Sequence, residues 1–287
     1  MKRQRTNWMF ILSVLCMVLT GCQRSYDSTQ SERDSSLTGI YSQMEQPSKA
    51  KEAIPSESTL KTDAPSETDT EGNIVISPPV AAKDKIIYLT FDDGPGEYTG
   101  HLLDVLDTYG VKVTFFVTNV QPEYQYLIGE AHRRGHTIAL HTATHDYSIY
   151  KSKDAYFKDL EQIKEVVRNQ TGQEVTLLRF PGGSSNTVSK KHCEGIMSVL
   201  AKEVVNRGYR YCDWNVSSGD GSISSEQVLK NVIEGVSANR ISIVLQHDSV
   251  KESVDAVDSI IQWGMENGYR FLPIVQDTAL WHHSVQN

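Results

Sequence analysis

From Asp84 onward, short apolar runs alternate with longer segments in which apolar residues recur at helical spacing. This alternation is typical of chains that fold as β-strand and α-helix units around a mostly parallel sheet. We therefore predict an α/β fold of about seven parallel strands, and periodicity alone does not choose between a closed barrel and an open, doubly wound sheet. The expected strands cover residues 86–91, 113–117, 137–141, 177–180, 209–214, 241–247 and 270–274.

Residue types that start or stop helices delimit the segments between these strands. The apolar pattern over residues 102–106 stops at Gly110, and the pattern over residues 160–167 stops at Gly172. Glycine just past the last apolar position is an expected helix end. Residues 224–227 read Ser-Ser-Glu-Gln and form a capping box that predicts the start of another helix.

Composition excludes one large class of partner. The chain has 287 residues, a formal net charge of -8 and no basic cluster outside its first residues. Phosphate binding needs clustered lysine and arginine, so we expect no nucleic-acid partner.

The first 22 residues resemble a bacterial export signal. Three basic residues among the first five precede an apolar run over residues 8–19, which is shorter than the roughly 20 residues that span a membrane. Leu19-Thr20-Gly21-Cys22 is similar to the lipobox of bacterial lipoproteins. The resemblance implies that residues 1–21 are a signal peptide and that Cys22 carries lipid, which would anchor the protein to the outer face of a bacterial cell membrane.

Residues 22–82 are rich in Ser, Thr, Glu, Asp and Pro and show little apolar periodicity. Such a composition cannot bury enough surface to fold, so we expect a disordered tether here. The folded domain is then expected over residues 83–287.

Two cysteines remain in this domain if Cys16 leaves with the signal and Cys22 carries lipid. Cys193 and Cys212 could pair in an exported protein, but the sequence cannot show whether their Cα atoms come close enough. We do not favour a disulfide. The four cysteines of the chain match no zinc-binding spacing.

Polar residues cluster at the ends of five expected strands. The carboxyl ends of parallel strands share one rim, where folds of this kind build their active sites. The clusters are Asp92 with Asp93, His141 with His145, Arg179, the segment from Asp213 to Asp220, and His247.

Asp92 and Asp93 are the first of these clusters. Neighbouring residues at a strand end face different directions, so one carboxylate can hold a metal while the other takes a proton from bound water. Alternatively, Asp-Gly-Pro over residues 93–95 simply opens a turn.

His141 and His145 are four residues apart, a spacing that suits metal ligands on one helical turn. The Glu of helical metalloprotease motifs is absent, and two surface histidines are the plainer interpretation of this spacing alone. Adding Asp93 gives two histidines and one carboxylate, which is a usual ligand set for catalytic zinc.

Four stretches resemble, in order and spacing, motifs of the NodB-type polysaccharide deacetylases, which form carbohydrate esterase family four. They are Thr90-Phe91-Asp92-Asp93-Gly94-Pro95, His141-Thr142-Ala143-Thr144-His145, Arg179-Phe180-Pro181-Gly182-Gly183 and Leu245-Gln246-His247. The resemblance implies a distorted (β/α) barrel of about seven strands. It also implies metal-dependent removal of acetyl groups from N-acetylated sugars, with Zn²⁺ expected and Co²⁺ as an alternative.

The resemblance also implies roles for single residues. Asp92 would be the catalytic base, and His247 the general acid that protonates the leaving nitrogen. Asp93, His141 and His145 would hold the metal.

Further roles follow from the third and fourth stretches. Arg179 would pair with the base, and its alternative role is a plain structural ion pair. The Gly182 N–H would stabilise the negative oxygen that develops. Pro181 and Leu245 would lie against the substrate.

A fifth family motif departs from its usual form in the stretch Asp213-Trp214-Asn215-Val216-Ser217-Ser218-Gly219-Asp220-Gly221. Relatives carry an aspartate that tunes the acid histidine and a tryptophan that walls the substrate groove. Aligned on Trp214, this chain has Ser217 and Gly221 at those positions. Trp214 stays a candidate substrate contact, and Asp220 a candidate partner of His247 reached by a different path.

The predicted function is N-deacetylation of a cell-envelope polysaccharide, most simply peptidoglycan N-acetylglucosamine, or N-acetylmuramic acid, by a monomer. One alternative is an O-acetyl esterase or other amide hydrolase on the same fold. Another is a non-catalytic lipoprotein that binds the wall. The terminal pair His282 and His283 is expected to be a frayed chain end.

Overall fold

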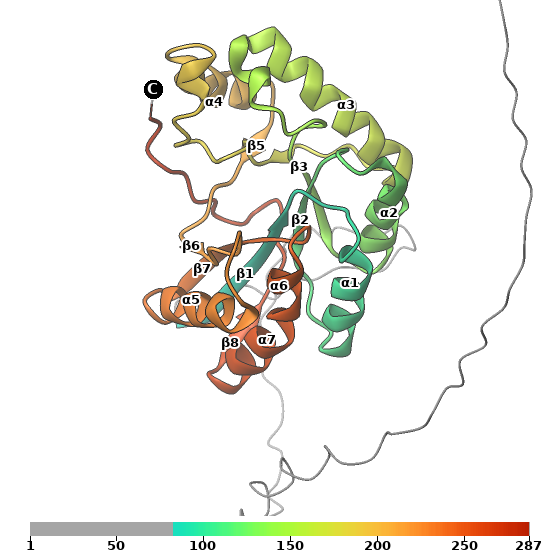
Figure 1. Cartoon of the computed structure of the whole chain (residues 1–287), viewed down its shortest axis with the longest axis vertical. Coiled ribbons are helices and arrows are strands. Elements are labelled where there is room, and N and C mark those ends of the chain that lie inside the picture. Colours follow the sequence, from blue (N-terminus) through green and yellow to red (C-terminus); the bar gives the residue numbers. More distant parts are fainter. Residues whose placement is uncertain (1–82, 287) are drawn as a thin grey trace, which may run out of the picture. The chain divides into compact units, whose positions relative to one another are not determined.

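A computed structural model describes residues 83–286 (Figure 1). The predicted signal peptide, lipid-bearing cysteine and tether lie outside these residues. Within residues 83–286, none of the helices combines the length and apolar character that crossing a bilayer requires.

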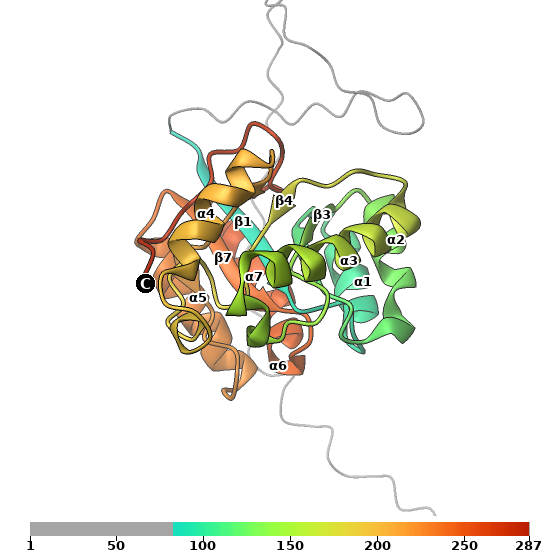
Figure 2. The ribbon, with the colours of Figure 1, turned by 90° about the horizontal axis from the view of Figure 1, so that it is seen from above.

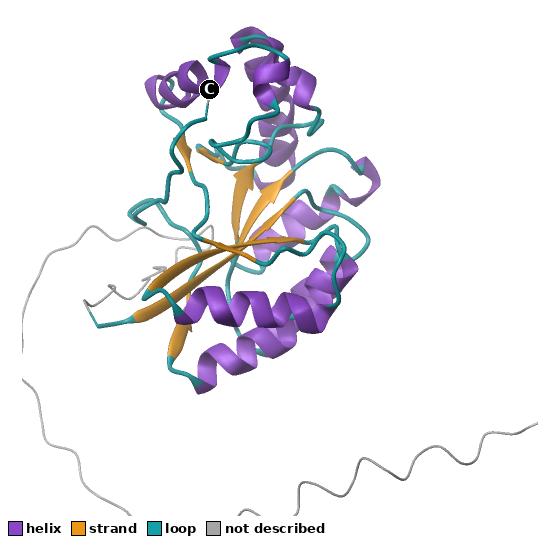
Figure 3. Cartoon of the chain, turned by 60° about the vertical axis from the view of Figure 1, so that its left-hand side comes forward, coloured by secondary structure: helices purple, strands orange, loops and turns teal. Residues whose placement is uncertain are grey.

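A single, entirely parallel sheet organises this part of the chain. Its strands follow the order β5-β4-β3-β2-β1-β7-β6, and β8 pairs with the first residues of β1. Figure 2 shows β1 and β7 side by side at the centre, and Figure 3 shows the strands as one twisted layer with helices along it. The strands are β1 (Lys85–Asp92), β2 (Thr114–Val117), β3 (Thr137–Leu140), β4 (Leu177–Leu178), β5 (Arg210–Tyr211), β6 (Val216–Ser217), β7 (Ile241–His247) and β8 (Tyr269–Phe271).

The prediction of a distorted (β/α) barrel of about seven parallel strands is confirmed. All seven expected strands are present, and the short β6 is an additional one. The strands expected over residues 177–180 and 209–214 are shorter than predicted. In the first of these, Pro181 and Gly182, which has a φ of 74°, turn the chain away from the sheet.

Helices separate most of the strands, and two of these helices, α3 and α5, begin at serine residues that cap them. Ser152 caps α3 by accepting a hydrogen bond from the Ala155 N–H, and Gly172 ends it with a φ of 73°. Ser224 caps α5 in the same way through the Gln227 N–H. The helices are α1 (Thr99–Thr108), α2 (Tyr126–Arg133), α3 (Lys153–Thr171), α4 (Ile196–Asn206), α5 (Ser225–Ser237), α6 (Lys251–Asp255) and α7 (Val257–Glu266), with 3₁₀ turns η1 (Pro122–Tyr124), η2 (Tyr147–Lys151) and η3 (Ser189–Lys191).

The central strand β1 separates two hydrophobic clusters. Ile87, Leu89 and Phe91 pack in the large cluster that includes the helices, while Ile86 and Tyr88 pack in a smaller cluster inside the curled sheet. Side chains alternate along a strand, so Thr90 and Asp92 continue the inner face. The sheet therefore places Asp92 at the carboxyl end of the barrel interior.

The C-terminal segment runs alongside the chain that follows β5. The Asp213 N–H donates to the Trp281 carbonyl at 2.8 Å, and the His282 ring stacks on Tyr211 with centroids 4.0 Å apart. The His283 N–H donates to a carboxylate oxygen of Asp213 at 2.8 Å. The prediction that these histidines fray was wrong, because backbone and ring contacts with the open end of the sheet hold them.

Cys193 and Cys212 are both free thiols. No disulfide joins these two residues.

Candidate active site

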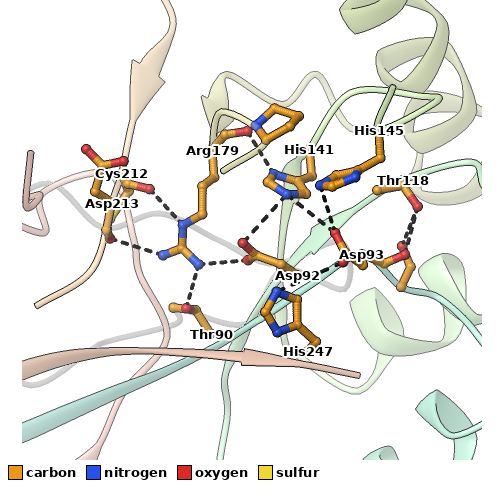
Figure 4. A network of polar contacts seen from close by, with 12 residues as sticks. Thr90, Asp92, Asp93, Thr118, His141, His145, Arg179, Cys212, Asp213 and His247 are labelled. Carbon is orange, nitrogen blue, oxygen red and sulfur yellow. Dashed lines mark hydrogen bonds and ion pairs between the residues drawn. The ribbon is translucent and has the colours of Figure 1, made fainter. Parts of the chain in front are cut away.

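Polar side chains from four strands meet at the carboxyl edge of the sheet (Figure 4). Register explains part of this arrangement, since Asp92 lies opposite His247 of β7 on one side and Phe116 of β2 on the other. The loops after β3 and β4 bring the others. The residues that meet are Asp92, Asp93, His141, His145, Arg179 and His247.

Arg179 and Asp92 form a buried ion pair. The Arg179 Nη1 donates to Asp92 Oδ1 at 2.7 Å and to Thr90 Oγ1 at 2.8 Å. Its Nε donates to the Cys212 carbonyl at 2.8 Å, and its Nη2 to the Asp213 carbonyl at 3.1 Å. Each nitrogen of the guanidinium therefore donates at least one hydrogen bond, and the planar group fixes the direction of the Asp92 carboxylate.

Burial and charge act on Asp92 in opposite senses. Complete burial raises the pKa of Asp92, while the charge and hydrogen bond of Arg179 and the charge of His247 act against that rise. A carboxylate that is both aimed and made more basic by its surroundings suits a general base.

Asp93, His141 and His145 place one ligand atom each within 4.8 Å of one another. Asp93 Oδ1 lies 3.5 Å from His141 Nε2 and 3.3 Å from His145 Nε2, yet this buried oxygen has no hydrogen-bond partner among the described residues. A buried carboxylate oxygen that faces two imidazole nitrogens without a hydrogen bond is the arrangement a cation would satisfy. The donor set fits a divalent metal such as zinc.

The protonation of His141 suits a metal ligand. Its Nδ1–H donates to the Arg179 carbonyl at 2.9 Å, which leaves the lone pair of Nε2 directed at Asp93. Burial lowers the pKa of His141 to about 3, despite the opposing charge of Asp93, so the ring is neutral near pH 7.

The backbone is strained at and beside the three candidate metal ligands. Asp93, Thr142 and His145 have φ values of 75°, 64° and 52°, which side chains other than glycine seldom adopt. Such residues persist only where the surroundings hold them, and they gather at functional sites.

Asp159 of α3 holds the loop that carries both histidines. Its Oδ1 accepts from the Ala143 N–H at 2.6 Å and the Thr144 N–H at 3.1 Å, and its Oδ2 accepts from the Thr144 hydroxyl at 2.8 Å. One helical carboxylate thus fixes the strained turn between His141 and His145. Asp159 was not predicted from the sequence. An acidic residue within a helix looks like an ordinary surface residue, and nothing nearby in the sequence indicates that it binds the backbone of a distant loop.

His247 pairs with Asp220. The His247 backbone N–H donates to Asp220 Oδ2 at 2.7 Å, and its ring Nδ1–H donates to Oδ1 at 2.9 Å. Burial lowers the pKa of His247, but the hydrogen bond and charge of Asp220, with the charges of Asp92 and Asp93, outweigh it and raise that pKa to about 9. The ring is therefore protonated at neutral pH, and its Nε2 lies 4.0 Å from Asp93 Oδ2.

A family model described as polysaccharide deacetylase matches residues 80–195. The chain is 31% identical over 196 residues to a peptidoglycan N-acetylglucosamine deacetylase of Bacillus cereus, covering 65% of this chain and 68% of that one. This chain belongs to the polysaccharide deacetylase family. As a member, it is a hydrolase of carbon–nitrogen bonds.

Two further relatives agree with this assignment. A peptidoglycan N-acetylmuramic acid deacetylase of Bacillus subtilis is 30% identical over 197 residues, covering 67% of this deacetylase and 71% of the relative. The crystal structure of the catalytic domain of a peptidoglycan N-acetylglucosamine deacetylase from Eubacterium rectale is 56% identical, with a TM-score of 0.71. That match covers 74% of this chain and 99% of the other.

The remaining predicted site residues of the deacetylase lie on the loops after β4 and β5 and on strand β7. Gly182 turns the loop after β4, and the Pro181 carbonyl accepts from the Tyr150 hydroxyl at 2.9 Å. Leu245 is 9% exposed within β7. The Trp214 ring lies 5.6 Å from the Arg179 guanidinium and is partly exposed.

Asp213 is a second residue that the sequence analysis did not assign. Its carboxylate accepts from the Ser184 N–H at 2.8 Å, the Ser184 hydroxyl at 2.5 Å and the His283 N–H at 2.8 Å. It thereby ties the loop after β4 and the C-terminal segment to the chain whose carbonyls hold Arg179. No spacing rule predicts a contact between residues so distant in sequence.

Proposed function

We propose that this deacetylase is metal-dependent and removes the N-acetyl group from N-acetylglucosamine residues of peptidoglycan, releasing acetate. One observation supports the metal most directly: Asp93, His141 and His145 converge around a buried carboxylate oxygen that has no partner among the described residues. The names of the similar proteins, which are peptidoglycan deacetylases, support the substrate.

The side chains divide the reaction between them. A zinc or cobalt ion held by Asp93, His141 and His145 would act as a Lewis acid toward the attacking water and the acyl oxygen. Asp92 takes the proton from that water, and Arg179 keeps the carboxylate of Asp92 directed at it.

Collapse to acetate requires a proton on the leaving nitrogen. His247 is charged at neutral pH and lies on the far side of Asp93 from His145, so it donates this proton as the carbon–nitrogen bond breaks. The backbone N–H of Gly182 makes no hydrogen bond within the described residues, which leaves it free to donate to the acyl oxygen.

The experiment is acetate release by the full chain after metal stripping, with Zn²⁺ or Co²⁺ added back and Asp92→Asn as a parallel control. The substrates are peptidoglycan, N-acetylchitotetraose and an O-acetylated sugar. We expect activity on the two N-acetylated glycans that returns only with metal and is lost in Asp92→Asn. Glycan binding without turnover would favour a wall-binding role. Turnover of the O-acetylated sugar alone would favour an esterase.

We also propose that lipid on Cys22 keeps the enzyme at the outer face of the membrane beside the wall. The lipobox-like Leu19-Thr20-Gly21-Cys22 supports this. Mass spectrometry of the protein from a native membrane fraction tests it, since an unmodified Cys22 would contradict the anchor.

A further inference from the structure

Tyr147 lies between a proposed metal ligand and the proposed oxyanion donor. It opens the η2 turn just after His145, and its ring meets the His145 ring edge-on with centroids 5.8 Å apart. On its other side the ring lies 6.1 Å from Tyr150, whose hydroxyl reaches Pro181. Tyr147 therefore bridges the loop after β3 and the loop after β4.

The Tyr147 hydroxyl occupies the space that a side chain at position 182 would need. A Cβ added to Gly182 would stand 2.8 Å from Tyr147 Oη and 3.4 Å from its Cε1. Gly182 has a φ of 74°, so a larger residue there would also be strained. The phenol oxygen thus lies directly against the Gly182 backbone, whose N–H is free.

The hydroxyl has no protein partner. Three tyrosines, Tyr147, Tyr150 and Tyr156, stand in one aromatic row. Tyr150 donates to a carbonyl and Tyr156 ends in an unpartnered, buried hydroxyl, whereas Tyr147 is partly exposed and makes no hydrogen bond among the described residues. A phenol keeps its proton at neutral pH, because its ordinary pKa is about 10. Tyr147 therefore offers a free O–H beside the free N–H of Gly182.

We propose that Tyr147 is a catalytic residue whose hydroxyl donates a second hydrogen bond, beside the Gly182 N–H, to the acyl oxygen of the substrate. The inference rests on the proposed hydrolytic function. As water adds to the acyl carbon, the carbon–oxygen double bond becomes a single bond and the oxygen gains negative charge. The phenol stabilises that charge and keeps its proton, so the bond is stronger in the transition state than in the substrate complex.

The test is Tyr147→Phe in the full chain with metal restored, assayed on N-acetylchitotetraose and on 4-nitrophenyl acetate. The phenyl ring keeps the packing against His145, and only the oxygen is lost. We expect kcat to fall on the order of 10- to 100-fold on both substrates with KM nearly unchanged, because one of two oxyanion donors is removed. The ester carries no sugar, so an equal loss on both substrates locates the bond at the acyl oxygen.

Tyr156→Phe is the matched control. It removes an unpartnered hydroxyl from the same aromatic row without touching the site, and we expect its kcat to stay within about twofold of the parent.

Three results would overturn the proposal for Tyr147: an unchanged kcat in Tyr147→Phe, a change in KM alone, or a loss confined to the glycan. Each leaves the proposed deacetylation intact. If the proposed function itself were wrong, the parent chain would release no acetate from the glycan. Hydrolysis of 4-nitrophenyl acetate by the parent and by Tyr147→Phe would then still test the role of Tyr147.

Discussion

The two acid–base pairs at the carboxyl edge of the sheet are built in opposite ways. Arg179 and Asp92 are 1% and 3% exposed, and the arginine donates to partners from β1 and from the chain after β5. The side chain of His247 is 28% exposed and has one charged partner in hydrogen-bond contact, Asp220. The Asp92–Arg179 pair is therefore buried and bonded to several segments of the chain. In the His247–Asp220 pair, the histidine is partly exposed and is held by one carboxylate.

The difference follows from what each pair does in the proposed reaction. A base that must stay ionised in a buried place needs a fixed positive charge and hydrogen bonds from several sides. A general acid must reach the leaving nitrogen and regain its proton from solvent, so it must stay accessible. Changes to the Asp92–Arg179 pair should therefore damage both activity and stability, and changes to the His247–Asp220 pair should mainly move the pH profile.

The largest effect is expected for Asp92→Asn. The amide keeps the size of the carboxylate but cannot accept the proton of water, so kcat/KM should fall by about 10³-fold. Arg179 also loses its countercharge in a buried place, so the midpoint of thermal unfolding should fall. Acetate release and a thermal melt measure both. Asp104→Asn is the control, since that carboxylate is exposed and pairs with Arg134, which is not a site residue. A loss below about tenfold in Asp92→Asn would contradict the role of Asp92 as base.

Arg179→Lys should have the next largest effect. Lysine keeps the positive charge, but its single nitrogen cannot replace the four hydrogen bonds that Arg179 makes from three nitrogens. The carbonyls of Cys212 and Asp213 should therefore lose their partners. We expect a loss of activity on the order of 10- to 100-fold and a loss of stability of about 1–3 kcal/mol. Urea unfolding, run beside the activity assay, checks both numbers. Full activity in the lysine variant would show that charge alone holds Asp92.

Asp220→Asn should sharpen the contrast by changing the pH profile. Burial lowers the pKa of His247, but Asp220 together with the charges of Asp92 and Asp93 raises it to about 9. The general acid must be protonated, so activity is lost as pH rises through that pKa. Without the carboxylate the alkaline limb of the kcat profile should move to lower pH, and activity near pH 7 should fall by about tenfold. Histidine NMR titration of the metal-free protein measures the pKa of His247 directly, and that pKa should also be lower in Asp220→Asn than in the parent. An unmoved alkaline limb would show that another group sets it.

The same pair should affect stability with a defined sign. The pKa of His247 is higher in the folded protein than the ordinary 6.5, so folding is favoured by the bound proton. This contribution is fully present below about pH 6.5 and is lost as pH rises toward 9. Unfolding of Asp220→Asn in urea should therefore depend less on pH across this window than unfolding of the parent.

The sequence predicted best the residues that belong to strands or to strand ends. Alternation of apolar runs gave the parallel sheet, and the positions of Asp92, Asp93, His141 and His247 follow from where strands stop. A strand end is a local property, because it is set by the neighbours of a residue in the chain. Which edge the ends share then follows from the parallel topology.

The sequence did not predict contacts that depend on three-dimensional closure. Asp220 could be named only as a candidate partner of His247, because the path of residues 217–221 is fixed by β6, a two-residue strand without periodicity. Asp159 binds the loop after β3 from helix α3, and Tyr147 lies against Gly182 in the loop after β4. Neither contact can be predicted from the residues that are near in sequence. The terminal histidines were misjudged for the same reason, since their partners lie about 70 residues earlier.

The smallest predicted effect concerns this C-terminal segment. Removing residues 281–287 deletes the Trp281 carbonyl and the His283 N–H that hold Asp213, and the His283 ring that donates to the Trp214 carbonyl at 2.6 Å. Asp213 supplies one of the carbonyls that fix Arg179, so the deletion should loosen the Asp92–Arg179 pair. A weakened hydrogen-bond network of this size should lower kcat by a few-fold.

Removal of residues 286 and 287 alone is the control, because these two residues make none of the contacts named above. The deletion of residues 281–287 should leave the alkaline limb set by His247 in place, since Asp220 does not touch the segment. A lowered kcat with an unchanged alkaline limb would assign the segment to the side of the site that holds the base. If the alkaline limb moved instead, the Asp92–Arg179 and His247–Asp220 pairs would be coupled through the chain between Asp213 and Asp220. The two pairs would then not act independently, although one is buried and the other exposed.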